Sequence, residues 1–426
     1  MWVWNRSRPL SDREIEALRQ AGVATLLWQA GEIAHSSGRA IVANRFPVPR
    51  GEDSGSLRVI PVVRIRATVG DPAALSASSL SDCLAELGVS RECQIDYDCP
   101  GSRLADYADL LGAVRREANL DPLSITALPS WSSHKTWPAL QVRVDALFPM
   151  FYDNVSEPEQ PSNRPSEAIP LIERGTLRHW LRTWNQNTTV PWVAGLPNFT
   201  RLSIFRGGAT RGHIRSWTQA EVFENPALSF DGTGKPGVFL YRALAPTRIG
   251  TTTLEQNDWI VFRRCDRTEL REALAQVENS NAGGTAWFQM PRPGLASRGW
   301  SLTEIGHDFA GTPELRVDLR PDRFALHNTG TADLAPFPEH LIEISLQGAE
   351  PFLREARPGS DFGGIEFRRD GEPVPPDFAT EMKLTLPKIR AGEVRELPLF
   401  LLRKPEIPLE TQWRINEASW SPVASL

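Results

Sequence analysis

Short apolar runs alternate with segments of helical periodicity over about the first 290 residues of the chain. The apolar runs have the length of strands, and the run at Arg58–Ala67 is continuous in β-branched residues, as is typical of a strand covered on both faces. Eight strands are expected, at Trp2–Asn5, Thr25–Ala30, Arg58–Ala67, Gln94–Asp98, Leu123–Leu128, Ala146–Tyr152, Trp192–Leu196 and Thr285–Met290. Because strands and helices alternate strictly, the pattern predicts an α/β fold with a parallel (β/α)8 TIM-type barrel.

The helical segments support this assignment. Helices are expected at Asp12–Ala21, Leu75–Leu87, Arg103–Ala118, Glu167–Asn185 and Thr268–Val277. Ser11 is a suitable N-cap for the first of them. An open doubly wound sheet is the structural alternative, but no GxGxxG sequence follows a predicted strand and no GxxxxGK[ST] sequence occurs. The barrel is therefore the favoured architecture.

Two segments depart from the alternation of strands and helices. Gly237–Ala243 and Trp259–Arg264 are predicted to form a hairpin inserted after the seventh strand. From about Glu314, helical periodicity is absent and short strands with turn residues between them predict a C-terminal antiparallel β-sandwich. We expect a barrel at residues 1–312, a β-sandwich at 313–404, and a tail at 405–426 that packs across the barrel or stays loose.

The composition narrows the classes of function. Hydrophobic residues make up 41% of the 426 residues and charged residues 23%, which is typical of a globular protein. The net charge of −5 gives no electrostatic footprint for nucleic acid or an anionic membrane. No apolar run has the length of a transmembrane helix, and no signal peptide is visible. The first predicted strand begins at Trp2, so either an upstream leader has been removed or the start codon is assigned too late. A removed leader would be consistent with the cell envelope or periplasm, and the compartment stays open.

The cysteine and histidine spacing gives no indication of a metal site or cofactor. Cys83, Cys93, Cys99 and Cys265 form no CxxC pair and no Cys/His ligand spacing, so we expect four reduced, buried thiols, no bound metal and no cofactor. The seven histidines form no HExxH motif, and GxSxG is absent. The oligomeric state is left open by the sequence.

The fourth predicted strand carries the most informative chemistry. Side chains alternate across a strand, so Gln94, Asp96 and Asp98 share one face, while Ile95 and Tyr97 share the other. Two carboxylates on one face raise each other's pKa, which separates a proton-holding acid from an ionised partner. The acids stand at the C-terminal end of the strand, which is where (β/α)8-barrel enzymes hold their catalytic groups.

Four motifs in chain order resemble those of the chitinase-type glycoside hydrolases of family 18. They are Ile95-Asp96-Tyr97-Asp98-Cys99-Pro100 on strand four, Met150-Phe151-Tyr152-Asp153 on strand six, Gly195-Leu196-Pro197 on strand seven and Gly284-Thr285-Ala286-Trp287 on strand eight. The insertion after strand seven is also similar to that family. The chain more closely resembles a group of bacterial proteins that share a domain of unknown function. These proteins have Asp-Tyr-Asp-Cys-Pro on strand four. That second resemblance implies no established activity.

The resemblance implies a role for each matching residue. Asp98 would be the general acid, and Asp96 would orient the substrate's N-acetyl group, which itself attacks the anomeric carbon. Tyr152 and Asp153 would contact that acetamido group, and Trp287 would form the floor of the sugar subsite. The chain departs from the pattern at two positions, where Asp98 replaces the family's Glu and Gln94 replaces an Asp. Asp98 is one methylene shorter, and a misplacement of about 1 Å can lower a rate about 10²-fold.

Further residues are candidates for the site. Glu32, near the end of strand two, is a candidate replacement acid or base. The candidates for substrate binding are Gln94, Met150, Trp287, Trp4, Asn5, Trp131 and Asn198. Indole rings suit this purpose because they offer a flat apolar face and one donor to a sugar.

Each candidate also has a purely structural interpretation. The acid pair could be a structural pair held by Arg64 or Arg66 on strand three, since buried acids are rarely found unpaired. Tyr152, Met150 and the tryptophans could fill the core.

Three hypotheses of function follow. The leading one is a glycoside hydrolase-like protein that acts on a polysaccharide or an N-acetylated glycan through Asp98 and Asp96. The second is a non-catalytic carbohydrate-binding barrel, which the shorter Asp98 favours. The third is a scaffold that binds a partner protein through its β-sandwich. The sugar, the linkage, the anomeric outcome and endo or exo action lie beyond the sequence.

Overall fold

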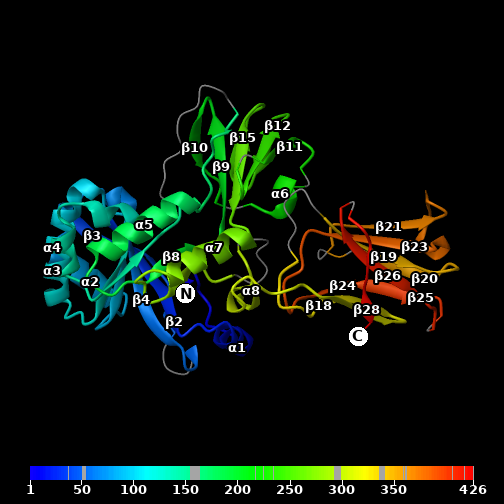
Figure 1. Ribbon diagram of the computed structural model, residues 1–426, viewed down its shortest axis with the longest axis horizontal. Coiled ribbons are helices and arrows are strands. Elements are labelled where there is room, and N and C mark those ends of the chain that lie inside the picture. Colours follow the sequence, from blue (N-terminus) through cyan, green and yellow to red (C-terminus); the bar gives the residue numbers. More distant parts are fainter. Residues whose placement is uncertain are drawn as a thin grey trace. The chain divides into compact units, whose positions relative to one another are not determined.

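A computed structural model describes the chain apart from residues 37, 50–53, 154–163, 216, 224, 234, 292–298, 335–340, 358, 360–361, 405, 417 and 426. The chain forms two compact units, Met1–Gly299 and Trp300–Leu426, which we call the first and second unit (Figure 1). The protein is of mixed α/β class, with a parallel sheet in the first unit and antiparallel sheets in both.

The first unit is built on parallel strands. The strands of the main sheet are β1 (Trp2–Val3), β2 (Thr25–Ser36), β4 (Arg58–Ile65), β5 (Cys93–Asp96), β6 (Leu123–Ala127) and β7 (Ala146–Pro149). Each pairs in parallel with the next, in this order. A separate parallel pair consists of β8 (Ala194–Pro197) and β16 (Thr285–Phe288). Strands are therefore present at all eight predicted positions.

Backbone contacts extend beyond these two sheets. Leu147 and Met150 form single parallel bridges to Trp192 and Gly195, which connect the β7 segment to the β8 segment. The segment after β16 contacts β1, because the Met290 amide donates to the Trp2 carbonyl oxygen over 2.8 Å. Side chains from β1, β2, β4 and β16 share one buried cluster, which contains Trp2, Trp4, Leu27, Ile60, Val62 and Ala286.

The strict alternation of strand and helix is wrong at the second strand. β2 continues to Ser36 and turns back into β3 (Arg39–Arg45), which pairs with it antiparallel. Glu32 therefore lies within β2 rather than beyond its end. Gly31 permits the close approach of the two strands, because a Cβ there would lie 2.7 Å from the Asn44 carbonyl oxygen.

The predicted helices are present with adjusted ends. They are α1 (Asp12–Gln20), α2 (Ala77–Glu86), α3 (Leu104–Glu117), α5 (Arg174–Asn187) and α7 (Arg267–Glu278), with an unpredicted short helix α4 (Trp137–Gln141). Figure 1 shows α2, α3 and α4 as successive neighbours beside the parallel strands. Ser11 forms the predicted cap of α1, in a reciprocal capping box with Glu14. α5 begins later than predicted because the Glu173 carboxylate accepts from the first amides of the helix.

The insertion after β8 is larger than the predicted hairpin. It contains β9 (Thr200–Arg206), β10 (Ala209–His213), β11 (Leu228–Thr233), β12 (Val238–Ala243) and β15 (Trp259–Arg264) in one five-stranded antiparallel sheet. The predicted pairing of β12 with β15 is confirmed. Shorter elements are α6 (Gln219–Phe223), β13 (Thr247–Ile249) and β14 (Thr252–Leu254). The insertion has its own apolar core, which includes Tyr241, Leu254 and Phe262.

The second unit contains α8 (Leu302–Gly306) and mostly antiparallel sheets. A four-stranded sheet has the order β24 (Val394–Glu396), β18 (Arg323–Asn328), β17 (Leu315–Arg320) and β28 (Ala424–Ser425). A six-stranded sheet has the order β22 (Glu372–Pro373), β21 (Gly364–Arg369), β23 (Glu381–Leu386), β19 (Ile342–Gln347), β26 (Glu410–Ile415) and β27 (Ser421–Pro422). β20 (Leu353–Arg357) pairs with β25 (Leu399–Leu402). All these sheets contribute to one apolar core, and the residues expected as a tail supply β26, β27 and β28.

Candidate active site

The predicted acids face a cavity of about 620 Å³ in the first unit. Asp96 is the last residue of β5, and Asp98 follows two residues later, so both carboxylates stand at the C-terminal end of that strand. The other predicted residues that line the cavity are Trp4, Asn5, Glu32, Met150, Tyr152 and Asp153. The structure thus brings together eight of the twelve residues that the sequence singled out.

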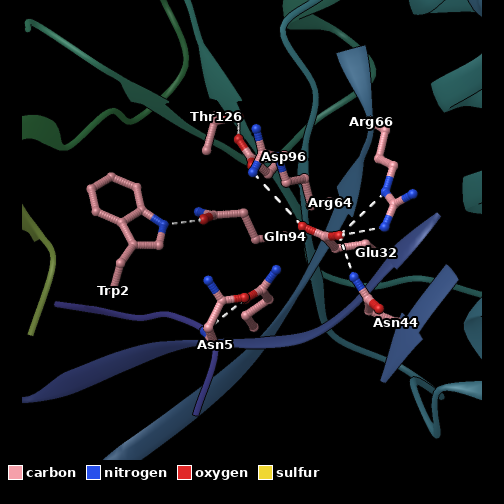
Figure 2. A network of polar contacts seen from close by, with 10 residues as sticks. Trp2, Asn5, Glu32, Asn44, Arg64, Arg66, Gln94, Asp96 and Thr126 are labelled. Carbon is pink, nitrogen blue, oxygen red and sulfur yellow. Dashed lines mark hydrogen bonds and ion pairs between the residues drawn. The ribbon is translucent and has the colours of Figure 1, made fainter. Parts of the chain in front are cut away.

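Asp96 is held by one hydrogen bond and one longer ion pair. The Thr126 hydroxyl donates to its Oδ1 over 2.7 Å, and Nε of Arg64 lies 3.7 Å from its Oδ2 (Figure 2). Burial, and then the charge of Asp98, raise the pKa of Asp96 to about 6, while Thr126 and Arg64 act in the opposite direction. Asp96 therefore retains its proton to a higher pH than an ordinary carboxyl group does.

Asp98 is the more accessible member of the pair. Among the described residues, no side chain donates a hydrogen bond to its carboxylate, and its side chain is exposed to the cavity. Burial raises the pKa of Asp98, and the positive charge of Arg64 opposes this rise. Because the charge of Asp98 is one of the causes that raise the pKa of Asp96, the two carboxyl groups titrate as an interacting pair.

Tyr152 and Asp153 follow the end of β7. Burial and the charges of Asp96 and Asp98 raise the pKa of Tyr152, so it presents a neutral phenol near the acids. Its ring stacks on Phe288 at a centroid distance of 6.0 Å. Asp153 forms an ion pair with Arg201 of the insertion; burial raises the pKa of Asp153, and Arg201 opposes this rise.

Glu32 belongs to a polar network with two arginines. Its carboxylate accepts from Asn44 over 2.6 Å and from Arg66 over 3.1 Å. Nη1 of Arg64 lies 3.8 Å away, and Figure 2 shows Arg64 between the carboxylates of Glu32 and Asp96. Glu32 is thus held by cations, as expected of a carboxylate that supports the position of Arg64.

Four predicted binding residues lie outside this cavity. Gln94 is fully buried and accepts from the Trp2 indole N–H over 2.7 Å. Trp131 is 1% exposed and packs edge-on against Tyr107. Asn198 is 1% exposed and donates to the Gln289 carbonyl oxygen, and Trp287 is 7% exposed. All four side chains are buried, and none of them lines the cavity.

The cavity also contains residues that sequence reasoning missed. Phe288, rather than its neighbour Trp287, presents the aromatic face of β16 to the cavity. The insertion contributes Arg201, His213, Arg215 and Trp217. Alternation along β16 could have distinguished Phe288 from Trp287 only if the inward face had been known, and the insertion residues match no motif.

Three further findings concern metal binding, membrane spans and the cysteines. Among the described residues, no group of three or more His, Cys, Asp or Glu side chains could hold a metal ion. Within the same part of the chain, no helix combines the length and apolar character needed to cross a membrane. All four cysteines are free and buried, as predicted.

Comparison with known families confirms the resemblance inferred from the sequence. Residues 59–218 match the family model described as "Domain of unknown function (DUF3142)". This match includes β4 to β8, both acids and the first strands of the insertion. No curated protein sequence matches the chain.

Solved structures similar to the chain include family 18 glycoside hydrolases. A family 18 N-acetylglucosaminidase from Paenibacillus barengoltzii is 12% identical with a TM-score of 0.41, over 69% of this chain and 95% of that chain. A chitinase from Chromobacterium violaceum is 12% identical with a TM-score of 0.45, over 70% and 96%. A spore cortex-lytic enzyme from Bacillus megaterium is 12% identical with a TM-score of 0.43, over 68% and 69%.

Proposed function

We propose that the chain is a glycoside hydrolase-like protein that acts on a polysaccharide or an N-acetylated glycan, with Asp98 and Asp96 as its acid–base pair. The observation that carries the proposal is the pair itself. Two carboxyl groups with raised pKa values stand at the end of one parallel strand and line a cavity large enough for sugar residues.

The proposal includes a fold for each unit. We propose that the eight parallel strands close into a (β/α)8-type barrel and that the second unit is a β-sandwich. The bridges from β7 to β8, the Met290–Trp2 hydrogen bond and the cluster shared by β1, β2, β4 and β16 support closure. The core shared by the sheets of the second unit supports a sandwich.

In the proposed reaction, Asp98 donates its proton to the glycosidic oxygen, and the bond from that oxygen to the anomeric carbon breaks. The carbonyl oxygen of the substrate's N-acetyl group forms a bond to the same carbon, as the resemblance implies. Water then attacks the anomeric carbon, the bond from the acetyl oxygen to that carbon breaks, and Asp98 takes the proton from that water. Asp96 holds the acetamido group and, in the ionised form that leaves the proton of the pair on Asp98, stabilises its developing positive charge.

The cavity supplies suitable partners for these steps. The phenol of Tyr152 is neutral and so can donate to the acetamido oxygen. Asp153 remains the second candidate for that group. Phe288 takes the place expected of Trp287 as the aromatic floor, because Phe288 lines the cavity and Trp287 does not. Trp4, Asn5 and Met150 are the remaining candidates for contact with the sugar.

A hydrolysis screen tests the catalytic proposal. Chitin oligosaccharides, peptidoglycan fragments and exopolysaccharides are incubated with the full chain, with Asp98→Asn and with the matched control Asp109→Asn on the exposed side of α3. Loss of general acid catalysis should lower the rate by about 10²- to 10⁴-fold in Asp98→Asn alone. Turnover that persists in Asp98→Asn would remove that residue from its assigned role.

The second candidate function is a carbohydrate-binding barrel without turnover. The observation that favours it is the shorter side chain at position 98, where the family that the motifs resemble has Glu. Under this alternative, the full chain binds oligosaccharides without cleaving them, and Asp98→Asn leaves the affinity unchanged while Phe288→Ala lowers it. Appearance of activity in Asp98→Glu would identify the missing methylene as the reason for the loss.

A further inference from the structure

The charges around the cavity are divided between the parallel strands and the insertion. The strand ends and the residues that follow them contribute the acids Glu32, Asp96, Asp98 and Asp153, together with Arg64. The titratable side chains that the insertion contributes to the described lining are all basic, namely Arg201, His213 and Arg215. We call these three residues the basic wall. Such a separation of charge favours a ligand with an anionic group on one side and neutral sugar atoms on the other.

His213 is held in this wall by a buried relay. Its Nδ1 lies 2.9 Å from the Ser203 hydroxyl, and that hydroxyl accepts from Nη1 of Arg263 over 2.9 Å. Arg263 is 2% exposed and donates also to the Ile169 carbonyl oxygen over 2.7 Å. The serine oxygen accepts from Arg263, and we assign its own hydrogen to Nδ1 of His213. The remaining ring nitrogen, Nε2, is then a donor.

The relay and its neighbours give the wall a positive potential. Arg201, His213 and Arg215 line the same cavity, and burial, followed by the charges of Arg201 and Arg215, lowers the pKa of His213. Asp153 pairs with Arg201 and therefore offsets one of these charges. Arg215 is exposed at the cavity and adds a guanidinium, whose planar fork suits a carboxylate.

We propose that the basic wall binds a carboxylate carried by a sugar residue in the cavity, with Arg215 supplying the charge and His213 an N–H donor. The preferred substrate class is then an acidic glycan, such as one that contains a uronic acid, rather than an uncharged polymer. The inference rests on the proposed function, because it concerns a ligand of the same cavity. A single carboxylate is favoured over a more highly charged anion, since the acids at the strand ends repel added negative charge.

Calorimetric binding to two matched tetrasaccharides tests this proposal. One alternates N-acetylglucosamine and glucuronate, and the other contains N-acetylglucosamine alone. Both are titrated into the full chain carrying Asp98→Asn, which prevents turnover. We expect about tenfold tighter binding of the acidic ligand at low salt, as for one charge-assisted contact, with the advantage shrinking as salt is added.

Variants of the wall separate its contribution from the rest of the cavity. In the same background, Arg215→Gln should remove about tenfold of the affinity for the acidic ligand and leave the neutral ligand unaffected, and Arg215→Lys should retain most of it. His213→Gln should act in the same direction. Arg211→Gln is the matched control. Arg211 lies on β10, the strand that contains His213, but it does not line the cavity.

Each outcome bears on one proposal or both. Equal affinity of the parent protein for the two ligands would overturn the carboxylate site and leave the glycan site standing. The carboxylate site would also be overturned if Arg215→Gln weakened the binding of both ligands equally. A tetrasaccharide with sulfate esters in place of carboxylates tests the source of the anion, and tighter binding of that ligand would also overturn the choice of carboxylate. Binding of none of the ligands would overturn the proposed function together with this inference.

Discussion

Asp96 illustrates how a single buried carboxyl group links function to stability. Its pKa in the folded chain is about 6, above the ordinary value of 3.8 that applies to an unfolded chain. The folded state therefore holds the proton more tightly, and its advantage is present below about pH 4 and is lost as the pH rises through about 6. Natural sites often retain such a destabilising group because the chemistry requires it.

Asp96→Asn should consequently stabilise the first unit at high pH. At pH 8 we expect the free energy of unfolding to rise by about 2 kcal/mol. Each unit of pKa corresponds to about 1.4 kcal/mol, and we reduce the total because the Asp96 side chain is partly exposed to solvent. The asparagine oxygen can still accept from Thr126. Urea unfolding at pH 4 and pH 8 measures the effect, which should vanish at pH 4. Equal stability of wild type and variant at pH 8 would contradict the raised pKa.

The same pair sets the expected pH dependence of hydrolysis. A proton must remain on the Asp96–Asp98 pair for Asp98 to act as an acid, so kcat/KM should fall as the pH rises through about 6. Initial rates between pH 4 and pH 9 on a soluble oligosaccharide provide the measurement. Arg64→Gln removes a cation that lowers the pKa of both acids, and it should shift this limb to higher pH. A limb that stays unchanged in Arg64→Gln would show that other groups control it.

At the scale of elements, β7 and β8 meet through a glycine. A Cβ at Gly195 would lie 2.8 Å from the Pro149 carbonyl oxygen and 3.3 Å from the Met150 Cα. Gly195→Ala should therefore separate the two strands, lower the free energy of unfolding by about 1–3 kcal/mol and weaken glycan binding, because Met150 and Tyr152 follow β7. Urea unfolding and calorimetry measure both effects.

Gly283→Ala serves as the control for that substitution. Gly283 lies just before β16, and an added Cβ would be 3.6 Å from the Trp192 carbonyl oxygen, which is an ordinary contact. We expect a change in the free energy of unfolding within about 0.5 kcal/mol. If both alanine variants behaved alike, the close approach at Gly195 would not explain the loss.

The elements that escaped prediction have a common physical cause. β3 was missed because Arg39–Arg45 is an edge segment in which only Ala40 is buried, so its hydrophobic signal is weak. The insertion was recognised only through β12 and β15, its most apolar strands, whereas β10 is a short, polar strand. Helices with apolar stripes and capping residues, such as α1 and α7, were predicted to within a few residues.

At the scale of the molecule, the described cavity lining comes from the first unit, and the second unit has its own core. Phe324 is fully buried in that second core. Phe324→Ala should lower the free energy of unfolding of the second unit by about 3–5 kcal/mol and leave the glycan affinity of the folded chain unchanged. Calorimetric melting and ligand titration of the full chain measure the two quantities. Phe378→Ala, at a residue that is 53% exposed, is the control.

A change of glycan affinity in Phe324→Ala below its melting temperature would indicate a contribution of the second unit to the site. Added ligand should raise the melting temperature of the first unit, since binding to the folded state stabilises it by mass action. Stabilisation confined to the second unit would place the glycan outside the cavity of Asp96 and Asp98.

Local order along the chain could be predicted from the pattern of residues alone. Periodicity and capping residues located the parallel strands and most helices, and alternation along β5 put Asp96 and Asp98 on one face. The tertiary structure decided which of the twelve candidates reach the cavity, because burial depends on neighbours that are distant in the chain. Gln94, Trp131, Asn198 and Trp287 have the same chemistry as surface ligands, yet packing and backbone bonds enclose them. The basic wall likewise arises only when the antiparallel insertion folds beside the strand ends, and no local pattern encodes that approach.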